Sequence, residues 1–189
     1  MDARVERTRR SLQEALFALT QERPLDEVTV GDIAERAGVN RSSFYQHYAD
    51  KETLLAFAIE SAADEAGVQL ADLDPESDEA PPALTNYLSH IDSNSEVYSS
   101  ALSPRGSALV ASRMRARLKK IVREGILSHS AEHRDDLTLE IESASITGAT
   151  FGIIEAWLAM DPRPPAETAV AWIWQSFGTP SGRWTAPPE

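Results

Sequence analysis

Residues 28–55 read VTVGDIAERAGVNRSSFYQHYADKETLL, and this stretch decides the fold of the N-terminal region. Two short segments with apolar residues at helical spacing are separated by Gly38, and the first contains the small residue Ala34. Glycine readily adopts the positive φ that a tight turn requires, and alanine lets two helices approach closely. The stretch therefore predicts helices over 30–37 and 41–48 that form a helix-turn-helix.

The residues ahead of each predicted helix are of the kinds that cap helices. Thr29 is a favoured N-cap, and Asp32 follows three residues later, as in a capping box. Asn40 is expected to cap the second helix in the same way. Asp50 is expected to cap a further helix that runs to about Leu70.

The apolar residues of the stretch predict which side of the second helix is buried. A wedge between the two helices is expected from Ile33, Ala37, Val39 and Phe44. The other side chains of the second helix carry hydrogen-bond donors and are expected to point outwards: Arg41, Ser42, Ser43, Tyr45, Gln46 and His47. A helix of this composition can lie in the major groove of DNA and read base edges with its N-terminal residues.

The stretch resembles the DNA-binding domain of the tetracycline-repressor (TetR) family. The resemblance covers roughly residues 5–60 and rests on Thr29, Ile33-Ala34, Ala37-Gly38-Val39, Phe44-Tyr45, His47-Tyr48, Asp50-Lys51-Glu52 and Leu54-Leu55. The rest of the chain resembles the family only in being helical with a long penultimate helix and a final helix. The resemblance implies a sequence-specific transcriptional regulator, usually a ligand-responsive repressor that binds a palindromic operator as a homodimer.

The resemblance also implies roles for individual residues of the helix-turn-helix. Arg41, Ser42 and Gln46 lie where the family reads bases, and Arg41 suits guanine as Gln46 suits adenine. Phosphate contacts are implied for Thr29, Ser43, Tyr45, His47 and Lys51. For Tyr48 we favour a packing role, because it lies where the family often has phenylalanine.

The net charge of −12 by itself argues against binding to nucleic acid. The charge is unevenly distributed, however, since residues 1–51 contain 8 Lys and Arg against 9 Asp and Glu, a net of −1. The acidity therefore lies mostly in residues 52–189, and DNA binding by the N-terminal region remains open. The alternative hypothesis is a helical protein-interaction module that has lost DNA binding, which predicts no salt-sensitive affinity for DNA.

Helical periodicity along the whole chain predicts an all-α fold with about nine helices. Ahead of the helix-turn-helix we expect a helix over 4–20. Beyond it we expect helices over 83–92, 95–102, 106–129, 136–160 and 165–177. The predicted domains are a helix-turn-helix DNA-binding domain over residues 1–52, a C-terminal dimerisation and effector-binding domain over 53–178, and a flexible tail over 179–189.

The C-terminal helices contain a candidate dimer interface. Gly148, Gly152 and Ala156 recur every four residues and would let another helix approach closely. Together with Trp172 and Ile173 of the last helix, they predict a four-helix interface between two copies of the chain. The alternative is that both helices simply complete the core of a monomer.

The family resemblance also implies an effector pocket in the C-terminal domain. Candidate lining residues are Tyr87, Ile91, Tyr98, Leu102, Met114, Leu118 and Phe151. Each of them can equally be ordinary core. A basic helix face carries Arg113, Arg115, Arg117, Lys119, Lys120 and Arg123. That face is interpreted as a solvated surface, with an anionic-ligand or nucleic-acid surface as the alternative.

Several other classes of function find little support. The chain has no cysteine, which excludes disulfides and thiolate nucleophiles and is typical of a reducing compartment. No apolar run approaches the roughly 18 residues of a membrane span. The H-x-x-E-H pattern at residues 129–133 is typical of zinc peptidases, but it falls where a helix is expected to end. We expect a cytoplasmic protein that is not an enzyme and has no cofactor, metal or membrane partner. The expected partners are double-stranded DNA, a second copy of the chain and an unidentified small-molecule effector.

Overall fold

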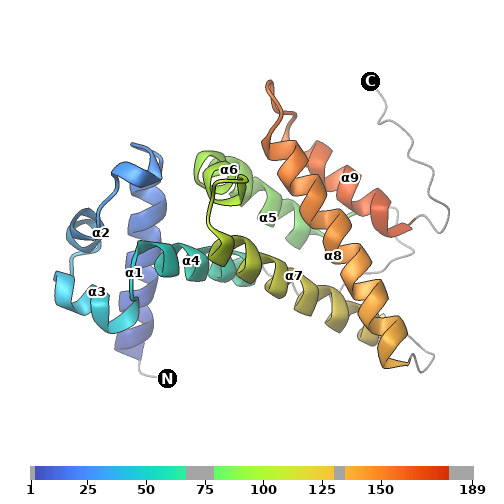
Figure 1. Ribbon diagram of the computed structural model, residues 1–189, viewed down its shortest axis with the longest axis horizontal. Helices are drawn as coiled ribbons and strands as arrows, with labels where there is room; N and C mark the ends of the chain where they lie inside the picture. The colour runs from blue at the N-terminus through green and yellow to red at the C-terminus, as the bar shows by residue number, and fades with distance from the viewer. Residues whose placement is uncertain (1–2, 67–78, 130–134, 179–189) are drawn as a thin grey trace. The chain divides into compact units, whose positions relative to one another are not determined.

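The computed structural model describes residues 3–66, 79–129 and 135–178, which form helices and contain no strand (Figure 1). The helices are α1 (Ala3–Thr20), the 3-10 helix η1 (Leu25–Glu27), α2 (Val30–Arg36), α3 (Arg41–His47), α4 (Lys51–Glu65), α5 (Pro82–Ser93), α6 (Ser95–Leu102), α7 (Ala108–His129), α8 (Asp136–Leu158) and α9 (Ala166–Gly178). The predicted all-α class with about nine helices is confirmed.

The helix ends follow local capping chemistry. Helix α7 begins at Ala108, two residues later than predicted, because the hydroxyl of Ser107 accepts a hydrogen bond from the Val110 amide at 3.1 Å. The predicted helix over 51–70 ends at Glu65, and residues 67–70 lie outside the described residues. The tail predicted over 179–189 also lies outside them.

The contacts between residues divide the chain into two compact units. The first unit contains the residues up to Ser61 together with Asn94–Met114, and the second contains Ala62–Ser93 together with the residues from Arg115 onwards. Helices α4 and α7 therefore contribute to both units. The two units differ from the predicted domains of 1–52 and 53–178, because each unit contains two separate stretches of the chain, whereas each predicted domain is one continuous stretch.

In the first unit, α2 packs against both α1 and α3. The core is built from side chains with no exposed surface, and they come from α1, α2, α3 and α4: Leu12, Leu16, Ile33, Phe44 and Leu54. Burying each side chain of this size contributes roughly 1.5–3 kcal/mol. The apolar residues that recur at helical spacing in these four helices therefore meet in one core.

Two polar contacts connect the helix-turn-helix region to residues 94–114 of the same unit. The amide of Gln21 donates to the side-chain oxygen of Asn94 at 3.5 Å, at the end of α1. The hydroxyl of Ser107 donates to the carboxylate of Glu52 in the first turn of α4. The turn that precedes α7 is therefore attached to the same body as α3.

In the second unit, α9 packs against both α5 and α8 (Figure 1). The largest buried side chain is Trp157 near the end of α8, and its indole N–H donates to the Pro164 carbonyl at 2.8 Å. The guanidinium of Arg163 donates to the Asp92 carboxylate at 3.0 Å. These contacts hold the connection between α8 and α9 onto α5.

Five of the six basic residues on the basic face of α7 are partnered by other helices, and Lys120 pairs with Glu124 of α7 itself. Within the first unit, Arg113 pairs with Glu60 of α4 at 3.3 Å. Within the second unit, Lys119 forms an ion pair with Glu140 of α8. Five further contacts involve Arg117 with Asp64, Lys120 with Glu124, Arg123 with both Asp136 and Glu140, and Arg115 with the ring of Phe151. Pairing of this kind favours a structural role for the basic face over a nucleic-acid surface.

Among the described residues, no helix combines the length and the apolar character that a membrane span requires.

Candidate nucleic-acid interface

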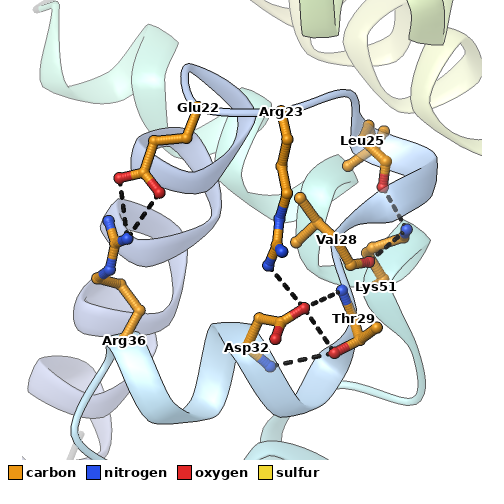
Figure 2. A network of polar contacts seen from close by, with 8 residues as sticks. All are labelled: Glu22, Arg23, Leu25, Val28, Thr29, Asp32, Arg36 and Lys51. Atoms are coloured by element: carbon orange, nitrogen blue, oxygen red, sulfur yellow. Dashed lines mark hydrogen bonds and ion pairs between the residues drawn. The ribbon is translucent and has the colours of Figure 1, made fainter.

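The start of α2 is held by a reciprocal pair of side chains (Figure 2). The hydroxyl of Thr29 accepts a hydrogen bond from the Asp32 amide at 3.2 Å, and the Asp32 carboxylate accepts from the Thr29 amide at 2.9 Å and from its hydroxyl at 2.7 Å. These bonds from Thr29, assisted by the nearby Arg23, lower the pKa of Asp32 below its usual value of 3.8. The predicted capping box is confirmed.

The turn between α2 and α3 has the predicted conformation. Gly38 adopts a φ of 68°, the left-handed region that side chains disfavour. After it, the side-chain oxygen of Asn40 accepts from the Ser43 amide and from the Ser42 hydroxyl, both at 2.7 Å. The backbone leaves α2 and enters α3 with the terminal amides of α3 capped, which fixes the direction of this short helix.

One face of α3 is buried by two aromatic residues. Phe44 has no exposed surface, and Tyr48, which ends the helix, is 3% exposed. The hydroxyl of Tyr48 accepts a hydrogen bond from the Gln13 amide of α1 at 3.2 Å. The packing role predicted for Tyr48 is confirmed, and α3 is thereby anchored to α1.

The opposite side of α3 is not covered by any of the described residues. Arg41, Ser42, Tyr45 and Gln46 are exposed, and the ring of Tyr45 is 54% exposed. Ser43 and His47 are half-buried. The six residues predicted to point outwards therefore form one short helical surface, rich in hydrogen-bond donors, on a backbone that caps and aromatic packing hold in place.

Two ion pairs connect α2 to the turn that follows α1 (Figure 2). Arg23 pairs with Asp32 at 2.7 Å, and Arg36 pairs with Glu22 at 2.8 Å. Sequence reasoning did not identify these pairs. The sequence shows only that both segments contain acidic and basic residues. It does not indicate which of them form ion pairs.

Lys51 is placed differently from the other predicted phosphate contacts (Figure 2). Its ammonium group donates to the backbone carbonyls of Leu25 and Val28, the latter at 2.7 Å. Burial lowers the pKa of Lys51 below its usual value of 10.5, and the Asp26 carboxylate partly opposes this shift. Two of the three N–H donors of the ammonium therefore hold the segment around η1 onto the start of α4.

Comparison with known proteins identifies the helix-turn-helix. Residues 12–58 match the family model described as bacterial regulatory proteins, tetR family. This part of the chain is similar to the helix-turn-helix of that family. A curated relative, the uncharacterized HTH-type transcriptional regulator YxbF of Bacillus subtilis (strain 168), is 39% identical over 66 residues. That match covers 34% of the chain and spans only 17% of the length of YxbF.

Solved structures match the chain over almost its whole length. The dihydroxyacetone kinase operon activator DhaS aligns with a TM-score of 0.66 at 17% identity, over 90% of this chain and 93% of its own. The tetR-family repressor FadR of Thermus thermophilus, in complex with lauroyl-CoA, aligns with a TM-score of 0.58 at 20% identity, over 96% of this chain and 100% of its own. At sequence identities this low, the similarity shows a shared fold only.

The residues predicted for the effector pocket fall into both units. The first unit contains Tyr98, Leu102 and Met114, and the second contains Tyr87, Ile91, Leu118 and Phe151. All are buried except Leu118, which is half-buried. The effector assignment stays a prediction for these seven residues.

The residues predicted for the dimer interface differ in exposure. Gly148, Gly152 and Ala156 are exposed on α8, and both glycines have open space where a side chain would be. Trp172 is half-buried, whereas Ile173 has no exposed surface and packs inside its own chain. Ile173 therefore supports the α9 surface from beneath.

No group of three histidine, aspartate or glutamate side chains that could hold a metal ion occurs within the described residues. The H-x-x-E-H pattern at 129–133 lies mostly outside them.

We predict that Lys51→Met destabilises the protein by about 1–3 kcal/mol, because two partly buried carbonyls lose their donor. The free energy of unfolding from urea denaturation measures the change. Lys120→Met is the matched control, since the Lys120 side chain is 67% exposed and the change should stay within about 0.5 kcal/mol. Equal effects of the two substitutions would contradict a structural role for Lys51.

Proposed function

We propose that the chain is a sequence-specific DNA-binding transcriptional regulator that acts as a homodimer on a palindromic operator and represses transcription in response to a ligand. The observation that carries the proposal is the exposed side of α3, where Arg41, Ser42, Tyr45 and Gln46 project from a helix anchored by Phe44. A short helix of this kind fits the major groove with its N-terminal residues at the base edges.

Specificity and affinity come from different residues in this proposal. Arg41 reads guanine through its two-pronged guanidinium, Gln46 reads adenine, and Ser42 contacts a neighbouring base edge. Ser43, Tyr45 and His47 contact phosphates, which set affinity and register. Thr29 and Lys51 contribute more weakly, since the Thr29 hydroxyl caps α2 and Lys51 has one N–H left for a phosphate.

We predict that Arg41→Ala removes the preference for one guanine in each half-site. Purified wild-type and variant proteins would each select duplexes from a random library, and the selected sequences would be compared. The wild type should select an inverted repeat with half-sites about one helical turn apart. Losing a bidentate contact should reduce discrimination at that position by about 1–3 kcal/mol.

Arg41→Lys is the control for charge, because it retains the cation and loses the guanidinium fork. It should also lose the guanine preference while retaining more of the overall affinity. An unchanged consensus in Arg41→Ala, with affinity reduced equally for all sequences, would show that Arg41 contacts phosphate and would overturn its reading role.

The homodimer is supported by the exposed small residues of α8. A helix face containing Gly148, Gly152 and Ala156 presents little side-chain bulk, so a second helix can approach closely. Two exposed apolar side chains enlarge this surface. Ile141 on α8 is 59% exposed, and Met160, just beyond the end of α8, is 41% exposed. Two copies that share this face would supply two α3 helices, one for each half-site.

We predict that Gly152→Arg produces a folded monomer. The site has open space in the single chain, so the side chain fits, but in a dimer it would place an unpaired cation in the interface. That penalty, about 3 kcal/mol or more, corresponds to at least roughly a 100-fold weaker dimer. Sedimentation equilibrium measures the mass.

Ala116→Arg on the exposed side of α7 is the matched control and should leave the mass of the dimer unchanged. A wild-type protein that is monomeric, or a Gly152→Arg protein with the wild-type mass, contradicts the proposed interface. Circular dichroism checks that both variants keep their helix content.

The ligand response is supported by polar atoms buried in the second unit. The hydroxyl oxygens of Thr147 and Thr150 on α8 are buried and have no hydrogen-bond partner among the described residues. Buried polar groups normally have partners, and a bound effector would supply them next to Phe151. FadR, which shares the fold, was solved with lauroyl-CoA bound. The effector must bind the DNA-bound and free forms with different affinities to change DNA binding.

A further inference from the structure

A cavity in the first unit shares no lining residue with α3 or with the residues predicted to line an effector pocket. Its volume is about 290 Å³, near the lower end of the range for small-molecule sites. Its walls come from η1, the first turns of α4, the end of α6 and the turn before α7: Leu25, Asp26, Lys51, Glu52, Leu55, Ser100, Ala101, Gly106 and Ser107. All of these residues belong to one compact unit.

The walls of the cavity are held in place by specific contacts. The Ser107 hydroxyl connects Glu52 to the start of α7 by donating to the carboxylate and accepting from the Val110 amide. The Ser107 amide donates to the Ala101 carbonyl at 2.9 Å. Gly106 lies so close to the carbonyls of Ser100 and Ala101 that a Cβ would approach them within 2.4 Å. The cavity therefore has a defined wall at the end of α6.

The charges around the cavity favour a cation. Asp26 and Glu52 contribute two exposed carboxylates at the rim, and the last turn of α6 contributes the partial negative charge of a helix C-terminus. The single cation in the lining, Lys51, donates two of its three N–H groups to the carbonyls of Leu25 and Val28 (Figure 2) and is attracted by the Asp26 carboxylate. The two carboxylates exceed this one positive charge, so the lining stays negative overall.

An anion would find few donors in the same cavity. The start of α4 is already capped, because the Asp50 carboxylate accepts from the Thr53 amide at 2.7 Å. The Ser107 hydroxyl is engaged with Glu52. Leu25, Leu55 and Ala101 provide apolar surface for the body of a ligand.

We propose that this cavity binds a small primary ammonium ion with a short aliphatic body, through Asp26 and Glu52. The site goes beyond the proposed DNA-binding function, since it does not use α3. Its occupant would lie between η1, which precedes α2, and the start of α4, which follows α3. Binding is measurable on the free protein, so the outcome does not depend on whether the chain binds DNA.

The test is titration of the 15N-labelled full-length protein with n-butylammonium, with n-butanol and butyrate as neutral and anionic controls of similar size. Saturable shifts of amide signals from the cavity residues are expected for n-butylammonium alone, with a Kd on the order of 1 mM for so small a ligand. Asp26→Asn and Glu52→Gln should each weaken binding roughly tenfold by removing a charged partner.

Glu27→Gln is the matched control, because Glu27 is an exposed carboxylate next to Asp26 that does not line the cavity. It should leave the Kd unchanged. Glutamine at position 52 can still accept the Ser107 hydrogen bond, so the cavity wall is retained. Ser100→Leu keeps all the charges and should reduce binding by filling the cavity.

The site is supported if Asp26→Asn and Glu52→Gln weaken the binding of n-butylammonium and Glu27→Gln does not. Equal affinity for n-butanol, shifts that do not saturate, or the same Kd in Asp26→Asn, Glu52→Gln and Glu27→Gln would overturn it.

Discussion

The burial of Phe44 is the constraint on which the rest of the candidate DNA interface depends. It is the one α3 residue with no exposed surface, and its position in the core determines the rotation of a helix only two turns long. Once that side is buried, Arg41, Tyr45 and Gln46 must face outwards, because they lie on the remaining sides of the helix. Tyr48 repeats the constraint four residues later through its contact with Gln13.

A helix as short as α3 would be marginal in isolation. Its stability comes from the caps and from the packing that surrounds it, and both are supplied by neighbouring segments. Asn40 satisfies its first amides, Gly38 directs the chain into it, and Lys51 attaches the following helix to the carbonyls around η1. The donors that the proposal assigns to DNA are therefore pre-positioned, which reduces the entropy lost on binding.

Sequence reasoning succeeded where local chemistry determines structure. The roles of Thr29 and Asp32, the positive φ of Gly38 and the burial of Tyr48 all depend on residues within a few positions of one another, or on a recognisable pattern. It was less informative where partners are distant. The contact of Lys51 with Leu25 joins residues 26 positions apart, and the ion pairs of α7 with α4 and α8 depend on how helices are arranged.

The candidate dimer and effector residues illustrate the same limit. Apolar periodicity identified Trp172 and Ile173 as one surface, yet one is half-buried and the other fully buried. Periodicity identifies the side of a helix that avoids water, but it does not distinguish the chain's own core from a partner. For α8 the glycines provide the better signal, because small residues that stay exposed leave room for a neighbouring helix.

A chain with a net charge of −12 is proposed to bind DNA through a small, nearly neutral N-terminal surface. The most direct test is the affinity of the purified full-length protein for a long DNA duplex, measured by fluorescence anisotropy from 50 to 200 mM salt. Binding that weakens linearly on a log–log plot, by roughly 10³-fold if a dimer neutralises about six phosphates, is the predicted result. No binding at 50 mM salt, or an affinity that does not change with salt, would contradict it.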